Sequence, residues 1–251
     1  MTTYRPTLRS KIKRLPKRAH YDHETVHAIL DAGFIAHVGY VIDGQPYVTP
    51  TAYWREDDRL YWHGSAASRM LRTVATSVPV CLTVTHLDGL VVARSGFHHS
   101  INYRSVMAFG EAAAIADPDE KLAALEAFVN RLYPGRWPEL RPVTRQELKG
   151  TTVVGMTIAE ASAKVRVGPP VDDEPDYALP LWAGTIAIRQ VVGEDVADPK
   201  LIPGTARPPG LADWQPGTSL DTLLTRLTEQ PLARTAGEGG ARPERVGRVR
   251  V

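Results

Sequence analysis

Alternation of apolar and polar residues with a period of two recurs along most of the chain and predicts many short strands. Residues 34–42 and 45–54 alternate in this way around Asp43-Gly44, a dipeptide that favours a tight hairpin turn. Further strands are expected at 59–64, 79–87, 90–97, 101–115, 151–161, 162–168 and 179–192. Helices interrupt these strands rather than alternate with them, so the pattern predicts a mainly β fold, an antiparallel barrel with helical additions.

Four segments are expected to form helices. A short one spans 22–32, with Asp22 as its N-cap and Gly33 as its stop. A second follows Ser65 and covers 66–77. The third, 117–133, has an Asp cap, Pro at its first position and Pro-Gly after its end. A weaker helical pattern lies at 220–228.

Charge is spread unevenly, although the net charge is only +2. Residues 1–20 carry seven Lys and Arg before the first acid, Asp22, which predicts a solvated basic arm. Contact of this arm with nucleic acid or an anionic membrane is the alternative, but no nucleic-acid partner is expected for the protein. No secretory or membrane-spanning run is visible, so no membrane association is expected. Cys81 is the only cysteine, which favours a cytoplasmic location.

The chain divides into three parts by composition. Residues 1–20 form the basic arm, 21–205 a single folded domain, and 206–251 a Pro/Gly-rich extension. Residues 233–251 contain almost no large apolar side chain, so this extension is expected to be partly disordered.

Residues 23–27 read HETVH, which fits the H-E-x-x-H signature of zinc peptidases. His23 and His27 lie one turn apart on the expected helix and project to nearly the same side. A zinc peptidase needs a third protein ligand. Leu30 and Phe34 stand where the extended motif places Gly and its third His. The context therefore argues against a metalloprotease.

The remaining histidines give weaker signals. His98 and His99 are adjacent, so on a strand they point to opposite faces and cannot share a metal unless the strand ends there. One of them is expected near a ligand. His37 is expected to be a strand residue with a satisfied partner.

Two stretches offer phosphate-binding groups. In LYWHGSAASRML, a strand is expected to end at Gly64 and a helix to begin at Ser65, with Ser68 and Arg69 beside the free N–H groups of its first turn. In NYRSV, Tyr103 is suited to stack on a ring, and Arg104 and Ser105 are donors. Alternation sends Arg104 and Ser105 to opposite faces, so they serve one ligand only at a bulge or a subunit boundary.

The order of these elements resembles the pyridoxamine 5'-phosphate oxidase-like family of flavin-binding split barrels, in particular its nitroimidazole-resistance and flavin-nucleotide-binding branch. Four pieces carry the resemblance from about residue 8 to 205: GQPYVTPTAYW, LYWHGSAASRML, PVCLTVTHLDGLVVARSGFHHSINYRSVMAFGEA and LPLWAGTIAI. The resemblance implies a split β-barrel and a homodimer with two FMN sites at its interface.

The resemblance also implies which residues hold the cofactor. Residues matching the strand along the isoalloxazine ring are Val48, Thr49, Pro50 and Thr51. Residues matching the end of the next strand and the helix start are Trp62, His63, Gly64 and Ser65. Ser68 and Arg69 match the phosphate grip, and Met70 stands where the family has a Lys. Tyr103, Arg104 and Ser105 match a later strand, with the Ser side supplied by the partner, and Trp182 matches a wall of the site.

An FMN-dependent oxidoreductase acting on a small molecule is the function that these residues indicate. His63, His98, His99 and Tyr103 are the candidates for tuning the flavin, and no side chain is assigned as catalytic. Authentic pyridoxamine phosphate oxidases end in a motif with Arg and His that is missing here, which argues against that reaction. The alternatives are a flavin carrier or sensor without turnover, and a relative that binds a deazaflavin or heme.

Overall fold

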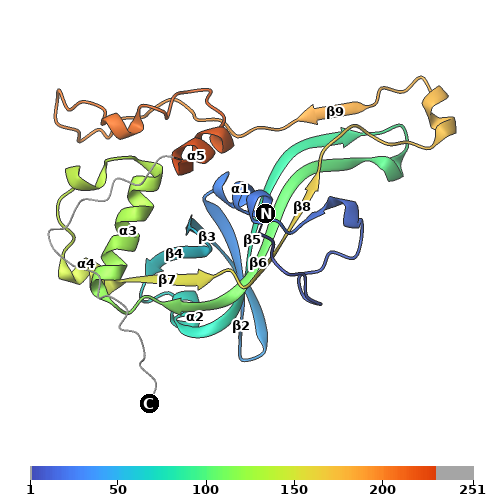
Figure 1. The fold of residues 1–251 in the computed structure, drawn as a ribbon. Helices are drawn as coiled ribbons and strands as arrows, with labels where there is room; N and C mark the ends of the chain where they lie inside the picture. Colours follow the sequence, from blue (N-terminus) through green and yellow to red (C-terminus); the bar gives the residue numbers. More distant parts are fainter. Residues whose placement is uncertain (1, 230–251) are drawn as a thin grey trace, which may run out of the picture.

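A closed ring of six antiparallel strands forms the centre of the computed structural model, which describes residues 2–229 (Figure 1). The ring consists of β2 (Ile35–Ile42), β3 (Gln45–Glu56), β4 (Arg59–Ser65), β5 (Thr76–Val92), β6 (Ser100–Ala114) and β7 (Thr151–Thr157). The pairing order is β6-β7-β4-β3-β2-β5, and β5 pairs back with β6. β8 (Glu160–Arg166) and β1 (Ala19–His20) extend the sheet beyond β6, and β9 (Gly184–Ala187) pairs with β5. The predicted split barrel with helical additions is confirmed.

Alternation along the strands sends every second side chain into the ring, where the main core lies. Val38, Leu60, Trp62, Leu82 and Met156 are all fully buried there. The helix α1 (His23–Asp31) adds Val26 and Leu30 to the same core, so its apolar face packs against the strands.

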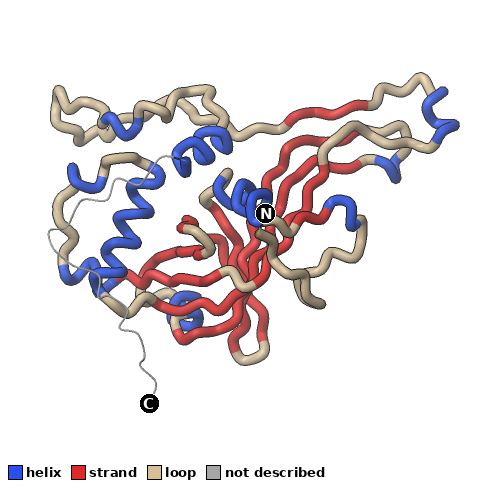
Figure 2. The backbone as a smooth tube through the Cα atoms, viewed as in Figure 1, coloured by secondary structure: helices blue, strands red, loops and turns tan. Residues whose placement is uncertain are grey.

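The other helices lie outside the ring, among the loops that Figure 2 colours tan. α3 (Pro118–Leu132) packs on the outer face of β3, β4 and β7, where Trp54, Tyr61 and Val153 form a second core. α2 (Arg69–Val74) connects β4 to β5, and α4 (Arg145–Gly150) precedes β7. α5 (Leu220–Glu229) contacts α1 and α3. Short 3₁₀ turns lie at Pro16–Arg18, Gly96–His98, Trp137–Glu139, Glu174–Ala178 and Pro209–Leu211.

Local capping explains why α1 and α3 appear where the sequence predicts them. The Asp22 carboxylate accepts a hydrogen bond from the Thr25 N–H at 2.7 Å, and Asp117 caps α3 in the same way. The sequence analysis missed α4, although Thr144 and Glu147 form a capping box, a signal visible in the sequence TRQE.

Two expected boundaries were wrong. Ser65 does not cap a helix, because β4 continues to Ser65 in its pairing with β7 and α2 begins only at Arg69. The strands expected on either side of Asp88-Gly89 form one continuous strand, β5, with an irregular register near Gly89. A side chain at Gly89 would meet the Ile186 carbonyl oxygen at 2.8 Å, so this glycine serves the close approach of β9.

Both terminal segments are more firmly packed than their composition indicates. Tyr4 is buried, and Arg9 pairs with Glu160 on β8, so the basic arm is not simply solvated. In the extension, Leu223, Leu224 and Leu227 of α5 are buried. The tail at 233–251, for which disorder is expected, lies outside the described residues.

A buried ion cluster joins three elements of the fold. Asp31, at the end of α1, accepts hydrogen bonds from Arg55 on β3 and from Arg131 on α3. Asp31 and Arg131 are each only 7% exposed. The cluster therefore fixes the angle at which α1 and α3 meet the barrel, and its charges depend on one another.

A long apolar arm extends away from the ring. It consists of the far halves of β5 and β6 together with β9 (Figure 1). Phe97 is 100% exposed and Trp182 68% exposed on this arm. Exposed apolar patches of this kind mark an interaction surface. No helix among residues 2–229 has the length and apolar content needed to cross a membrane.

Candidate functional site

The turn between β4 and α2 presents a serine hydroxyl and a guanidinium that the protein itself does not use. The Ala66 N–H donates to the Gly150 carbonyl oxygen at 2.8 Å, and Ser65 accepts from the next two N–H groups. Ser68 is the N-cap of α2, but its hydroxyl makes no capping hydrogen bond. The Arg69 guanidinium lies 4.6 Å over the Tyr47 ring and has no carboxylate partner within residues 2–229. Ser68 and Arg69 thus suit an anionic ligand.

β3 lies beside this turn, because Tyr47, the residue that Arg69 covers, is on this strand. Tyr47 packs on the main core, so alternation turns its neighbour Val48 to the other face of the strand. Val48, 67% exposed, and Pro50 point outward, whereas Thr49 contacts the Tyr40 hydroxyl at 3.1 Å. The Thr51 hydroxyl bonds to the Ala52 carbonyl oxygen of its own strand. The structure therefore brings the predicted ring strand and the predicted phosphate grip together.

Trp62 and His63 do not join this surface. Trp62 is fully buried in the main core, so its side chain takes no part in this surface, and its cofactor contact stays a prediction. His63 points to the opposite face and packs against Trp54 and Phe128 under α3, with ring centroids 5.9 and 4.8 Å apart. Burial lowers the pKa of His63, and its Nδ1 has no hydrogen-bond partner among the described residues.

Arg104 is engaged by two carboxylates of its own chain. Its Nη2 lies 2.7 Å from Asp88 Oδ1 and 3.1 Å from Asp221 Oδ2, at the start of α5. The hydrogen bonds to Asp88 raise the pKa of Arg104. The phosphate role expected for Arg104 is therefore not available in this arrangement, since its charge is already neutralised. A cavity of about 210 Å³ beside this cluster also contacts His86 and Ser219.

The Asp221 contact gives α5 a testable acid sensitivity. Hydrogen bonds from Ser219, then from Thr222 and Arg104, hold the pKa of Asp221 below its usual range. A carboxylate with a lowered folded pKa stabilises the fold above its unfolded pKa and loses this effect as the pH falls through the folded pKa.

We expect Asp221→Asn to lower the free energy of unfolding at pH 6.5 by only about 1 kcal/mol, because the Asp221 side chain is 40% exposed. The difference should shrink as the pH falls below about 4, the ordinary pKa of Asp, and should vanish once the pH is below the lowered folded pKa of Asp221. Urea unfolding at pH 6.5 and at a series of lower pH values measures this. Asp213→Asn, which removes the exposed pair with Arg226, is the control. A difference that persists undiminished at low pH would contradict the assignment.

The predicted site residues fall into two groups that are far apart within one chain. Ser68 and Arg69 lie just before the start of β5. Tyr103, Arg104 and Ser105 pair with residues 85–87 of β5. Trp182 lies just before β9, which pairs with the far end of β5. β5 has 17 residues, which is roughly 55 Å of extended strand. Ser105 and Arg104 also diverge, since the Ser105 hydroxyl bonds to the Lys164 carbonyl oxygen on β8. One chain therefore does not assemble both groups.

His37 is an exposed histidine without a hydrogen-bond partner in the described part of the chain. It is exposed on the outer face of β2 between Ile35 and Val41, which are also exposed, and it has no hydrogen-bond partner within residues 2–229. The expectation that His37 has a satisfied partner was therefore wrong. Five other histidines are engaged in hydrogen bonds or ion pairs: His23, His27, His86, His98 and His99.

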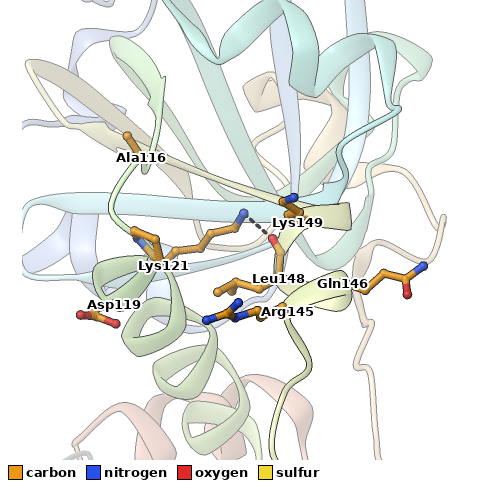
Figure 3. A pocket seen from close by; sticks show the side chains of 8 residues that line it. Ala116, Asp119, Lys121, Arg145, Gln146, Leu148 and Lys149 are labelled. Atoms are coloured by element: carbon orange, nitrogen blue, oxygen red, sulfur yellow. Dashed lines mark hydrogen bonds between the residues drawn. The ribbon is translucent and has the colours of Figure 1, made fainter.

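A second cavity, of about 1070 Å³, lies between α3 and α4 (Figure 3). Its lining includes the cations Lys121, Arg145 and Lys149, and the Lys121 ammonium donates to the Leu148 carbonyl oxygen at 2.6 Å. The last residue of α4, Gly150, is the one that holds the β4–α2 turn through Ala66. The cleft is therefore close to the turn, and three cations line it. The sequence analysis did not find this cleft.

The family model for pyridoxamine 5'-phosphate oxidase matches residues 22–165, more than half of the chain. The chain belongs to this family. The match covers the whole six-stranded ring and α1 to α4, so the family resemblance seen in the sequence is confirmed.

Two solved structures of this family type extend the match beyond the ring. The flavocytochrome Anf3 from Azotobacter vinelandii is 48% identical, with a TM-score of 0.79, over 84% of this chain and 98% of that chain. The FAD and heme binding protein from Mycobacterium smegmatis is 36% identical, with a TM-score of 0.76, over 81% of this chain and 98% of that chain. No curated protein matches the sequence.

Met70 is the position at which this member of the family departs from the expected phosphate grip. Met70 is only 6% exposed and packs in the main core beside Leu71 and Val74. A Lys ammonium at that depth would need a charge partner. Ser68 and Arg69 therefore carry the anion-binding capacity of this turn.

Proposed function

We propose that this protein is an oxidoreductase of the flavocytochrome type, which binds FAD and heme and acts on a small molecule. The observation that carries the proposal is the pair of relatives whose names specify a flavocytochrome and FAD with heme, each matched over 98% of its own length. The match reaches past the family model, so it includes the segments that surround the ring.

The residues around the β4–α2 turn fit a flavin. Ser68 and Arg69 supply a hydroxyl and a guanidinium for its phosphate, and β3, whose Tyr47 lies under Arg69, would run along its ring. FAD is favoured over the FMN expected from the sequence, because the relative from Mycobacterium smegmatis is named as a protein that binds FAD. The cations of the α3–α4 cleft, joined to the turn through Gly150, would suit the additional phosphate of FAD.

His37 fits heme. A histidine that holds heme must offer a free imidazole nitrogen, and His37 would do so beside Ile35 and Val41, because it has no hydrogen-bond partner within residues 2–229. When bound, the flavin supplies two-electron chemistry and the heme one-electron chemistry. The chain binds and orients both groups and excludes water from them.

A homodimer with the cofactor site at its interface follows from the separation of the two groups of site residues. A second copy would bring the arm with Tyr103, Ser105 and Trp182 to the turn with Ser68 and Arg69, and would cover Phe97. Analytical ultracentrifugation should therefore find a dimer, and a monomer carrying both cofactors would contradict this part of the proposal.

Arg69→Ala should weaken flavin binding by about 10- to 100-fold, because a charge-assisted hydrogen bond to a phosphate contributes about 1.5–3 kcal/mol. Fluorescence titration of the reconstituted protein measures the change. Arg72→Ala is the matched control, since Arg72 is exposed on the same helix one turn later. Equal effects of the two substitutions would contradict the role of Arg69.

Absorption spectroscopy with extraction and mass spectrometry of the cofactors tests the function directly. The expected result is one FAD and a heme Soret band, with oxidation of NAD(P)H or reduction of a quinone or nitroaromatic compound. A protein that stays colourless with added FAD and hemin would overturn the proposal. Bound flavin without any turnover would favour a carrier or sensor.

A further inference from the structure

The two histidines of HETVH meet a carboxylate that the sequence does not place near them. His23 Nδ1 and His27 Nε2 each lie 3.2 Å from Asp58 Oδ1. Asp58 comes from the turn between β3 and β4. The sequence analysis argued against a metal because it found no third ligand for the two histidines. The structure places a carboxylate suited to that role beside them, but it comes from another element of the fold.

Tyr4 completes the cluster from the N-terminal segment. Its hydroxyl lies 2.9 Å from His27 Nε2 and donates to Asp58 Oδ1 at 3.0 Å. Its buried ring stacks on His23 with centroids 4.0 Å apart. The phenol hydroxyl therefore bonds to the two atoms that would hold a metal, so a bound metal would replace these two hydrogen bonds, whereas the stacking on His23 would remain.

We propose that His23, His27 and Asp58 form a binding site for a divalent transition metal of the zinc type. The three ligand atoms lie within 4.8 Å of one another. Tetrahedral zinc with bonds of 2.0–2.2 Å separates its ligand atoms by roughly 3.3 Å, which agrees with the two 3.2 Å spacings to Asp58. The residue types, two imidazoles and a carboxylate, are those of known zinc sites.

The carboxylate of this site is free of cationic side chains, which distinguishes it from a second His/Asp cluster. Within residues 2–229 no Lys or Arg pairs with Asp58. In the second cluster, Asp172 accepts from both the backbone and the guanidinium of Arg94, and His98 Nδ1 is bonded to Ser95. A metal at this second cluster would have to displace the Arg94 guanidinium from Asp172 and the Ser95 hydroxyl from His98.

The site joins elements rather than forming a peptidase centre. Glu24, the residue of the motif that would activate a water, is exposed and makes no contact with the cluster. The metal would fasten α1, the β3–β4 turn and, through the stacking of Tyr4 on His23, the N-terminal segment. The expected consequence of binding is a more stable fold.

Zinc titration of the full-length chain as purified, after mild chelation, tests the proposal. We expect one Zn²⁺ per chain by calorimetry and elemental analysis, with a higher Tm in Zn²⁺. His23→Gln and Asp58→Asn should each weaken binding more than tenfold, because each removes a proposed ligand. His98→Gln is the matched control from the second cluster and should bind as the wild type does.

The Tm measurement protects the test against a variant that is merely less stable. A folded Asp58→Asn protein whose Tm no longer responds to Zn²⁺ supports the site. A wild type that takes up no zinc, or zinc uptake that is lost in His98→Gln and kept in Asp58→Asn, would overturn it. Zinc is counted separately from iron, so the result is independent of heme.

Discussion

Asp31→Asn is expected to lower the free energy of unfolding by about 3–5 kcal/mol, because it leaves two buried guanidinium groups without their counter-charge. Arg131 is 7% exposed and Arg55 only slightly more, and both bond to the Asp31 carboxylate. Burial lowers the pKa of Arg131, and the neighbouring Asp31 carboxylate acts in the opposite direction and favours its charge.

Urea unfolding followed by tryptophan fluorescence measures this effect. Glu139→Gln is the control, since it removes an exposed pair with Arg136 and should change stability by less than about 1 kcal/mol. Combining Asp31→Asn with Arg131→Met should recover part of the loss, because one uncompensated charge is removed. A single substitution that costs no more than the control would show that water or another group satisfies the two arginines.

His37→Ala is expected to abolish the heme Soret band while the flavin band remains, because the variant lacks the imidazole that would bind the iron. His37 lies on an exposed outer strand and makes no hydrogen bond within the described part of the chain, so the substitution should leave the fold intact. Pyridine hemochrome quantification with a Tm measurement gives heme per folded chain.

His99→Ala serves as its control, since His99 is also exposed but bonds to the Ser95 carbonyl oxygen. A normal heme content in His37→Ala would place the axial ligand elsewhere, without affecting the flavin assignment. A loss of both cofactors at unchanged Tm would instead indicate that heme and flavin share the outer face of β2 and β3.

Local features of the fold followed from the sequence because they depend on residues near one another in the chain. Asp22 and Asp117 cap their helices through the next few N–H groups. The Asp43-Gly44 hairpin and the strands around it follow from alternation. Ser68 and Arg69 lie in the turn where the spacing of LYWHGSAASRML places them, although the helix begins three residues later than expected.

Only the tertiary structure decided what the polar groups face. Trp62 and His63 sit on opposite faces of β4, and both are covered by residues distant in the sequence. Arg104 forms an ion pair with Asp221 of α5, which is more than a hundred positions away in the sequence. Asp58, from the β3–β4 turn, lies beside the histidine pair of α1. Such contacts depend on strand register and on where the chain returns, because side-chain pairing is set by distance in space. The sequence by itself determined the barrel, its helix caps and the place of Ser68 and Arg69 between β4 and β5. The closing of the ring decided which charged groups remain free of partners, because it sets which side chains meet in space.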